Sequence, residues 1–217
     1  MGGRGASSLL KGASDYFFGT GASKGSPIVI SKINDKSLQG IENRIRKLKH
    51  EEAFIFNEND KLVAGVMGDS NSVDFPKEWM DMDGATVTHG HPSNRYGFGG
   101  TLSLHDAETM TYTQWGELRA SANGRGEYNY IMRRTPNSNN LGLRMQIIKD
   151  RASLKERLAD ELNRAYNDAI NSGASVKTAN LISAQRGTGI IQAYWREVLP
   201  QYGFEYVTPK KEYVYGR

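Results

Sequence analysis

The sequence predicts an α/β protein of the α+β kind, in which helices flank a mixed sheet. Three observations support this fold class. Short apolar runs bounded by turn residues recur between residues 52 and 149, as strands do. Apolar residues at helical spacing precede that region, and a longer amphipathic pattern follows it. The hydrophobic fraction of 38% and the aromatic fraction of 10% are typical of a globular chain.

Residues 1–33 are rich in Gly and Ser and predict a flexible N-terminal segment. Its opening, Gly-Gly-Arg-Gly, resembles those of some phage-encoded structural and accessory proteins. Residues 34–50 predict a helix capped by Asn34 or Asp35. The apolar stripe of this helix consists of Leu38, Ile41, Ile45 and Leu48.

The first strands follow this helix. Residues 52–56 are an apolar run, and the polar residues 57–60 have turn chemistry, so residues 61–68 are expected to return as the second strand of a hairpin. Residues 77–80 predict one helical turn. Residues 85–88 form a short apolar run that predicts a buried strand.

The second half of the sheet contains another hairpin. Residues 104–114 predict a helix, after which residues 117–121 and 127–134 are expected to pair as strands. The Asn-Gly pair at residues 123–124 between them is a strong hairpin signal. Residues 141–149 predict a last strand.

The pattern divides the chain into a mixed α/β domain at residues 34–150 and a helical C-terminal extension at residues 151–217. In the extension we expect helices at residues 152–171, 176–185 and 190–199. An Arg-Gly-Thr-Gly sequence is expected to separate the last two. These helices are candidates for a substrate platform, a partner-binding module or a cover for the sheet.

One motif carries candidate chemistry. The expected strand at residues 85–88 runs into His89-Gly90-His91-Pro92, and Ser103 and Asp106 follow at the start of a helix. Residues i and i+2 of a strand point to the same side, so both imidazoles can face one point. Two imidazoles and one carboxylate make a three-ligand metal site with an open position, as catalytic zinc requires.

Each part of this motif also has a purely structural interpretation. A His-x-His pair can satisfy itself against backbone groups, and Glu52, which begins an apolar strand upstream, can be a surface acid. Ser103 and Asp106 have the spacing of a helix capping box, an interpretation compatible with metal binding. The order of these features along the chain favours the metal site.

In this order, His-x-His-Pro followed by Ser-x-x-Asp resembles the JAB/MPN (JAMM) zinc metalloprotease superfamily, and His89-Gly90-His91-Pro92-Ser93 is closest to its RadC-like branch. The resemblance covers roughly residues 50–150 and implies a JAB/MPN-like (cytidine-deaminase-like) fold. The eleven residues between His91 and Ser103 exceed the family's usual spacing. The additional residues lie in a Gly-rich loop, residues 94–100, where insertions are tolerated.

The resemblance also implies roles for individual residues. It implies Zn²⁺ held by His89, His91 and Asp106, with water as the fourth ligand. The family has a glutamate on an upstream strand that acts as general base, and Glu52 is the expected match, with its neighbour Glu51 as the alternative. Ser103 is implied to stabilise the oxyanion.

The function implied by the resemblance is zinc-dependent hydrolysis of a peptide or isopeptide bond in a protein or peptide substrate, for instance one with a ubiquitin-like tail. The first alternative is a non-catalytic interaction protein on the same fold, such as a phage accessory protein that binds a host or virion partner. A nucleic-acid-associated protein is the second alternative, although the net charge of +4 comes from dispersed basic residues, which are more typical of a solvated surface.

Composition restricts the remaining possibilities. The chain has no cysteine, which removes disulfides, thiol catalysis and Cys-ligated zinc. No apolar run is long enough to span a membrane, and the N-terminus has no signal-peptide core. We therefore expect a cytoplasmic protein, in the host cytoplasm if the chain is phage-encoded. The loop at residues 94–100 flanks the expected metal ligands and is a candidate substrate contact or lid.

Overall fold

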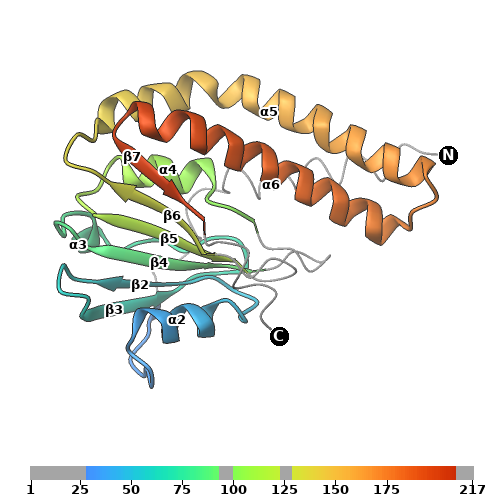
Figure 1. Ribbon diagram of the computed structural model, residues 1–217. Coiled ribbons are helices and arrows are strands. Elements are labelled where there is room, and N and C mark those ends of the chain that lie inside the picture. The colour runs from blue at the N-terminus through green and yellow to red at the C-terminus, as the bar shows by residue number, and fades with distance from the viewer. Residues whose placement is uncertain (1–27, 93–99, 123–128, 209–217) are drawn as a thin grey trace.

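Seven strands pair into one mixed sheet in the computed structural model, which describes residues 28–92, 100–122 and 129–208 (Figure 1). The order across the sheet is β1-β3-β2-β4-β5-β6-β7. The strands are β1 (Ile28–Val29), β2 (Glu52–Phe56), β3 (Leu62–Met67), β4 (Thr86–His91), β5 (Glu117–Ala122), β6 (Asn129–Arg134) and β7 (Phe204–Val207). The helices are α2 (Leu38–Ile45), α3 (Lys77–Met80), α4 (Leu104–Met110), α5 (Asn140–Asn171) and α6 (Val176–Gln201).

Strands β4 and β5 form the parallel pair of this sheet, and the other described pairs are antiparallel. Parallel neighbours need a crossover connection, usually through a helix. Here the crossover carries α4, which starts after β4 has ended. The N-terminus of α4 is thus brought back toward the carboxyl end of β4, where the His-x-His sequence lies.

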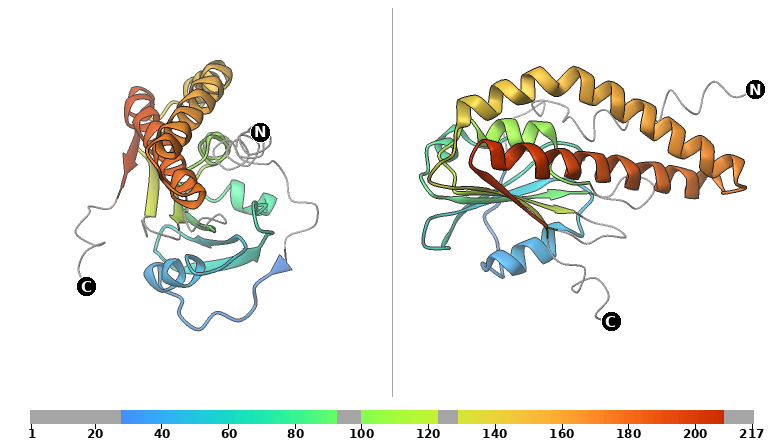
Figure 2. Two further views of the ribbon diagram at one scale, coloured as in Figure 1. Left: turned by 90° about the vertical axis from the view of Figure 1, so that its right-hand side faces the viewer. Right: turned by 45° about the horizontal axis from the view of Figure 1, so that its top comes forward.

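The two faces of the sheet pack against different helices. Helices α4, α5 and α6 lie on one side of the sheet, and α2 lies on the other (Figures 1 and 2). The larger hydrophobic core lies on the side of α4, α5 and α6. The smaller core joins Ile41 and Ile45 of α2 to Phe54 and Phe56 of β2. We call these two sides the ligand face, which carries His89, and the α2 face.

The expected strand at residues 141–149 is wrong, because these residues are the start of α5. A strand would place Leu141, Leu143 and Met145 on one face, but Leu143 is buried while Leu141 and Met145 are exposed. Asn139 caps the helix by accepting a hydrogen bond from the backbone N–H of residue 142, at 2.8 Å. The burial pattern has helical spacing and continues through residues 150 and 151, where the sequence suggested a domain boundary.

The expected break at residues 186–189 is also wrong, since α6 continues through them. Helix propensity disfavours glycine by only about 1 kcal/mol, which tertiary packing readily offsets. Gly187 and Thr188 are buried there. Arg186 pairs with Glu161 of α5 at 2.7 Å, and Ser183 donates a hydrogen bond to the Leu162 carbonyl at 2.9 Å. Contacts with α5 therefore hold α6 together.

Most other elements agree with the sequence, with small shifts at their ends, but β7 is a strand within the extension that was expected to be helical, and β1 lies within residues 1–33, which were expected to be flexible. The hairpin of β2 and β3, the turn of α3 and the strands β5 and β6 lie where they are expected. The first helix is shorter than residues 34–50, and its cap is Ser37 rather than Asn34 or Asp35. The Asn-Gly turn at 123–124 and the loop at 94–99 lie outside the described residues.

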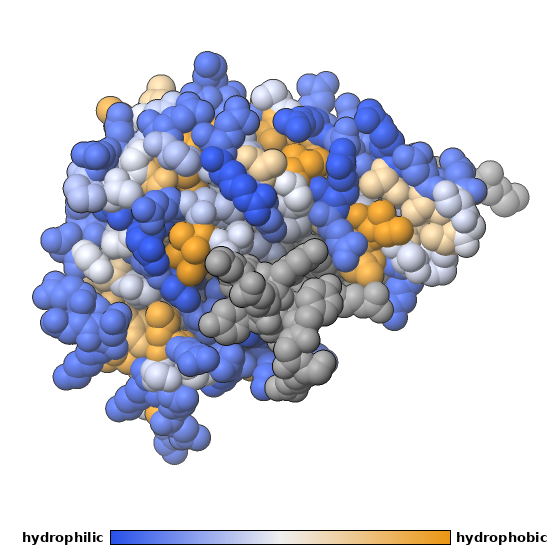
Figure 3. All heavy atoms as spheres, viewed as in Figure 1, coloured by the Kyte–Doolittle hydropathy of each residue, from blue (hydrophilic) through white to orange (hydrophobic). Residues whose placement is uncertain are grey.

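The long hairpin of α5 and α6 projects past the sheet (Figures 1 and 2). No helix within the described ranges has both the length and the apolar character that a membrane crossing requires. The face drawn in Figure 3 is mostly hydrophilic and carries several separate hydrophobic areas. Exposed apolar side chains on α5 include Leu141, Met145 and Ile148.

Candidate metal centre

Strand β4 presents its two histidines on the ligand face. His89 lies directly opposite Ala53 of β2 and Ala120 of β5. His91, two residues on, points to the same side because side chains alternate along a strand. The Nε2 atoms of His89 and His91 are 2.9 Å apart, and both side chains are buried. The two imidazoles therefore converge on one point, as their spacing predicts.

Asp106 reaches the same point from the first turn of α4. Its Oδ1 lies 3.1 Å from Nε2 of His89, and its Oδ2 lies 3.3 Å from Nε2 of His91. A capping box orients this carboxylate: the Ser103 backbone N–H donates to Asp106 Oδ2 at 2.7 Å, and the Asp106 backbone N–H donates to Ser103 Oγ at 3.1 Å. The helix cap expected for Ser103 is thus also the support of the third ligand.

The donor set fits a metal such as zinc. The ligand atoms of His89, His91 and Asp106 all lie within 4.8 Å of one another. Neighbouring ligands of tetrahedral zinc lie about 3.3 Å apart. The closest atoms of the three side chains are separated by 2.9 to 3.3 Å. Nε2 of His89 points into this cluster, while its Nδ1 is buried without a hydrogen-bond partner among the described residues.

When no metal is bound, a proton on His91 and the negative charge of Asp106 stabilise each other. Burial opposes the charging of His91, but hydrogen bonding and charge from Asp106, with the charge of Glu51, outweigh it and raise the pKa of His91 to about 9. Burial alone would raise the pKa of Asp106, yet His89 and His91 hold it well below its ordinary value. A proton on His91 and a metal cation therefore compete for the same place.

Glu52, the expected general base, does not face this cluster. Glu52 is adjacent to Ala53, the residue paired with His89, so its side chain points to the α2 face. There it pairs with Arg44 of α2 at 2.7 Å and lies 3.2 Å from Nε2 of His50. The assignment of Glu52 to the site is therefore corrected: its carboxylate is buried in an ion pair on the other side of the sheet.

The neighbouring residue, Glu51, is the acid that interacts electrostatically with His91 and Asp106 of the cluster. Burial is the main cause that raises the pKa of Glu51 to about 8; His91 opposes this, and Asp106 and Asp69 add to it. Its backbone is held by two hydrogen bonds, to the Asp69 carbonyl at 2.7 Å and from the backbone N–H of residue 68 at 2.8 Å.

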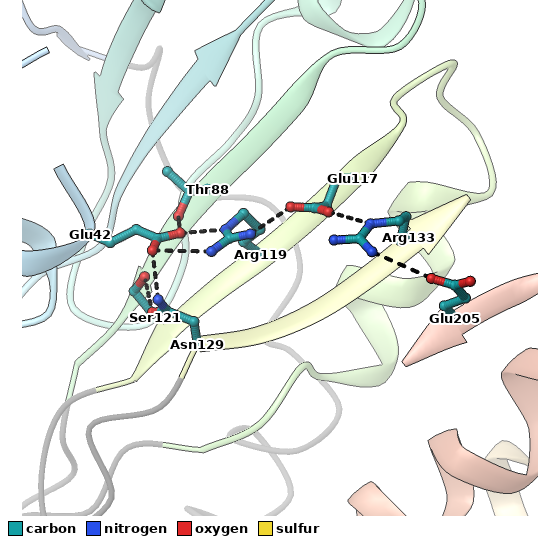
Figure 4. Close-up of polar contacts among 8 residues, drawn as sticks. All are labelled: Glu42, Thr88, Glu117, Arg119, Ser121, Asn129, Arg133 and Glu205. Atoms are coloured by element: carbon teal, nitrogen blue, oxygen red, sulfur yellow. Dashed lines mark hydrogen bonds and ion pairs between the residues drawn. The ribbon is translucent and has the colours of Figure 1, made fainter. Parts of the chain in front are cut away.

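A second polar network occupies the α2 face (Figure 4). Glu42 of α2 is buried and accepts hydrogen bonds from Arg119 of β5 and Asn129 of β6. Arg119 also pairs with Glu117, which pairs in turn with Arg133. Every side chain in this chain of contacts joins α2 to the sheet or one strand to the next. Because it lies across the sheet from His89, this network serves packing rather than the metal centre.

The remaining expectations concern the connection between β4 and α4. Ser103 is buried and lies beside Asp106, with its hydroxyl accepting a hydrogen bond in the capping box. The proposed lid, residues 94–100, lies outside the described residues except for Gly100. Gly100, the last residue of this loop, forms a backbone hydrogen bond with His91. Hydrogen bonds from the surrounding protein help to orient metal-binding histidines.

The chain matches no protein-family model, and comparisons with curated proteins and with solved structures give no match.

Proposed function

We propose that the protein is a zinc-dependent hydrolase of peptide or isopeptide bonds, with a site of the JAB/MPN type. One observation carries the proposal: two histidines from β4 and an aspartate from α4 converge within hydrogen-bond distance, and the charges of His91 and Asp106 act on the carboxyl group of Glu51. The mixed sheet with helices on both faces agrees with the fold that this family implies. The ligands would be His89, His91 and Asp106.

The chemistry divides between the metal and the protein. A bound zinc would lower the pKa of a coordinated water to about 7, far below that of bulk water, and polarise a substrate carbonyl. We assign the general base to Glu51 in place of Glu52. Its carboxylate would take a proton from the attacking water and return it to the leaving nitrogen, and a group in this role typically contributes about 10²–10⁴ in rate.

Ser103 supplies a second polar group. Its Oγ accepts a hydrogen bond from the Asp106 backbone, which leaves the hydroxyl proton of Ser103 available for donation. We propose that the hydroxyl donates a hydrogen bond to the carbonyl oxygen as negative charge develops there. Loss of one such donor typically costs about 2.7–4 kcal/mol of transition-state stabilisation.

The adjacent glutamates give a matched test. Zinc-loaded wild type, Glu51→Gln and Glu52→Gln would be assayed with an internally quenched peptide library and with lysine-linked ubiquitin dimers. We expect Glu51→Gln to keep zinc and lose cleavage by about 10²-fold or more. Glu52→Gln should keep both. Cleavage by Glu51→Gln at the wild-type rate, or no cleavage of any probe by the zinc-loaded wild type, would contradict the proposal.

A non-catalytic interaction protein is the second candidate, and a specific feature favours it. Leu141, Met145 and Ile148 are exposed at i, i+4 and i+7 along α5, a spacing that places them on one side of the helix. An apolar stripe of this kind suits a partner protein. In that case the chain would bind its partner equally well with His91 replaced by alanine, a change that would abolish hydrolysis if the first candidate is right.

A further inference from the structure

Two elements of the C-terminal extension hold the segment that leads into the metal centre. Trp195 of α6 donates a hydrogen bond from Nε1 to the Leu102 carbonyl at 3.0 Å. The Tyr206 hydroxyl of β7 lies 2.5 Å from the Thr101 hydroxyl. Trp195, Thr101 and Leu102 are almost completely buried. The contacts therefore join parts of the chain about a hundred residues apart.

The held residues lie between two groups that support metal ligands. On one side, Gly100 forms a backbone hydrogen bond with His91. On the other side, Ser103 orients Asp106 through the capping box. The four residues from Gly100 to Ser103 thus contact one metal ligand at each end, and the C-terminal elements bind the two residues in the middle.

Tyr206 is placed for this contact by the register of the sheet. It lies opposite Met132 of β6, which lies opposite Leu118 of β5, and Leu118 lies opposite Val87 of β4. Paired residues share a side of the sheet, so the side chain of Tyr206 is on the ligand face. Burial raises the pKa of Tyr206 well above its ordinary value, so its hydroxyl stays protonated over the working range of pH.

We propose that Tyr206, with Trp195, is a positioning residue of the metal centre, and that the C-terminal extension acts through residues 100–103 to fix Asp106 and His91 for metal binding. The inference rests on the proposed function, since it requires these ligands to hold zinc. Tyr206 and Trp195 act through Thr101 and Leu102, so we assign neither of them a contact with the metal or the substrate. The extension is consequently a part of the site rather than an attached module.

The test compares Tyr206→Phe and Thr101→Val with a matched control, Tyr202→Phe. The Tyr202 hydroxyl, from the residue that follows α6, donates to Gln146 of α5 at 3.1 Å, a contact that involves no residue of the metal centre. Zinc affinity would be measured by competition with a chromophoric chelator. Outer-shell partners typically contribute 10–100-fold to metal affinity, so we expect a loss of about tenfold in each test variant. Because the two changes remove the same hydrogen bond, the variant that combines Tyr206→Phe with Thr101→Val should lose no more zinc affinity than either single variant.

Amide hydrogen exchange on the metal-free proteins tests the positioning of residues 100–103 separately from the binding of zinc. We expect residues 101–106 to exchange faster in Tyr206→Phe than in the wild type, and at the wild-type rate in Tyr202→Phe. Wild-type zinc affinity in Tyr206→Phe, or a loss of equal size in Tyr202→Phe, would overturn the positioning role. If the wild type itself binds no zinc, the proposed function fails. Exchange at residues 101–106 that is unchanged in Tyr206→Phe would overturn the positioning of the segment, whether or not zinc binds.

Discussion

Ala53 lies directly opposite His89 across the β2–β4 pair, and this pairing decides which of two adjacent glutamates faces the metal ligands. Glu52 follows the alternation of the strand to the α2 face, where Arg44 neutralises it. Glu51 is left on the side of His91 and Asp106. Neighbouring carboxylates thus have different environments: one is buried in an ion pair, and the other is poised near neutral pH beside the candidate ligands.

The first prediction concerns the stability of the two glutamate variants. Glu52→Gln removes the charge that Arg44 and His50 contact, and we expect the free energy of unfolding to fall by about 1–3 kcal/mol. Glu51→Gln replaces a carboxyl group that is costly to ionise, so at pH 8 the metal-free variant should be at least as stable as the wild type. Urea denaturation of both variants checks this. A larger loss of stability in Glu51→Gln than in Glu52→Gln would contradict the assignment.

A second prediction concerns how the stability of the metal-free protein depends on pH. The pKa of Glu51 rises on folding from 4.5 to about 8, and that of His91 from 6.5 to about 9. Between these limits the folded chain binds more protons than the unfolded chain, so the free energy of unfolding falls as pH rises from about 4.5 to 9. The lowered pKa of Asp106 has the opposite effect, and stability is lost as pH falls below its ordinary value of 3.8.

Thermal unfolding of the metal-free protein across this range of pH, with Glu51→Gln as the control, checks the prediction. In the variant the decline should begin only near pH 6.5, because His91 alone then contributes. A melting temperature that rises between pH 5 and 9 in the metal-free wild type would show that the cluster does not bind these protons.

The third prediction concerns protons released by zinc. Metal ligands must be deprotonated, and the raised pKa of His91, about 9, means that it carries a proton at pH 7. Zinc should therefore displace about one proton from His91, and its affinity should rise about tenfold per pH unit up to pH 9. Isothermal titration calorimetry in buffers of different ionisation enthalpy measures this release. Binding without any release of protons would place the metal elsewhere.

The candidate ligands could be predicted because their geometry is local. His89 and His91 are two residues apart on one strand, and Ser103 and Asp106 have the spacing of a helix cap, so each pair is arranged by its own element. The choice between Glu51 and Glu52 could not be made in this way. It depends on the register of β2 against β4, and both faces of β2 are buried, so the pattern of apolar residues does not distinguish them.

The helical half was harder to predict, since its continuity depends on tertiary packing. Glycines within α6 suggested a break, but contacts such as that between Arg186 and Glu161 stabilise the helix across it. The start of α5 resembled a strand because apolar residues alternate over a few positions there. The support of residues 101 and 102 by Trp195 and Tyr206 arises only when segments far apart in the chain fold together.

Zinc content per chain tests the central claim most directly. Wild type, His91→Ala and Glu52→Gln would be expressed with zinc in the medium, purified without chelator or nickel, and measured by elemental mass spectrometry. We predict near one zinc per chain in the wild type and in Glu52→Gln, and none in His91→Ala, whose cluster loses one of three ligands. A wild type without zinc, or a His91→Ala variant that retains it, would contradict the account.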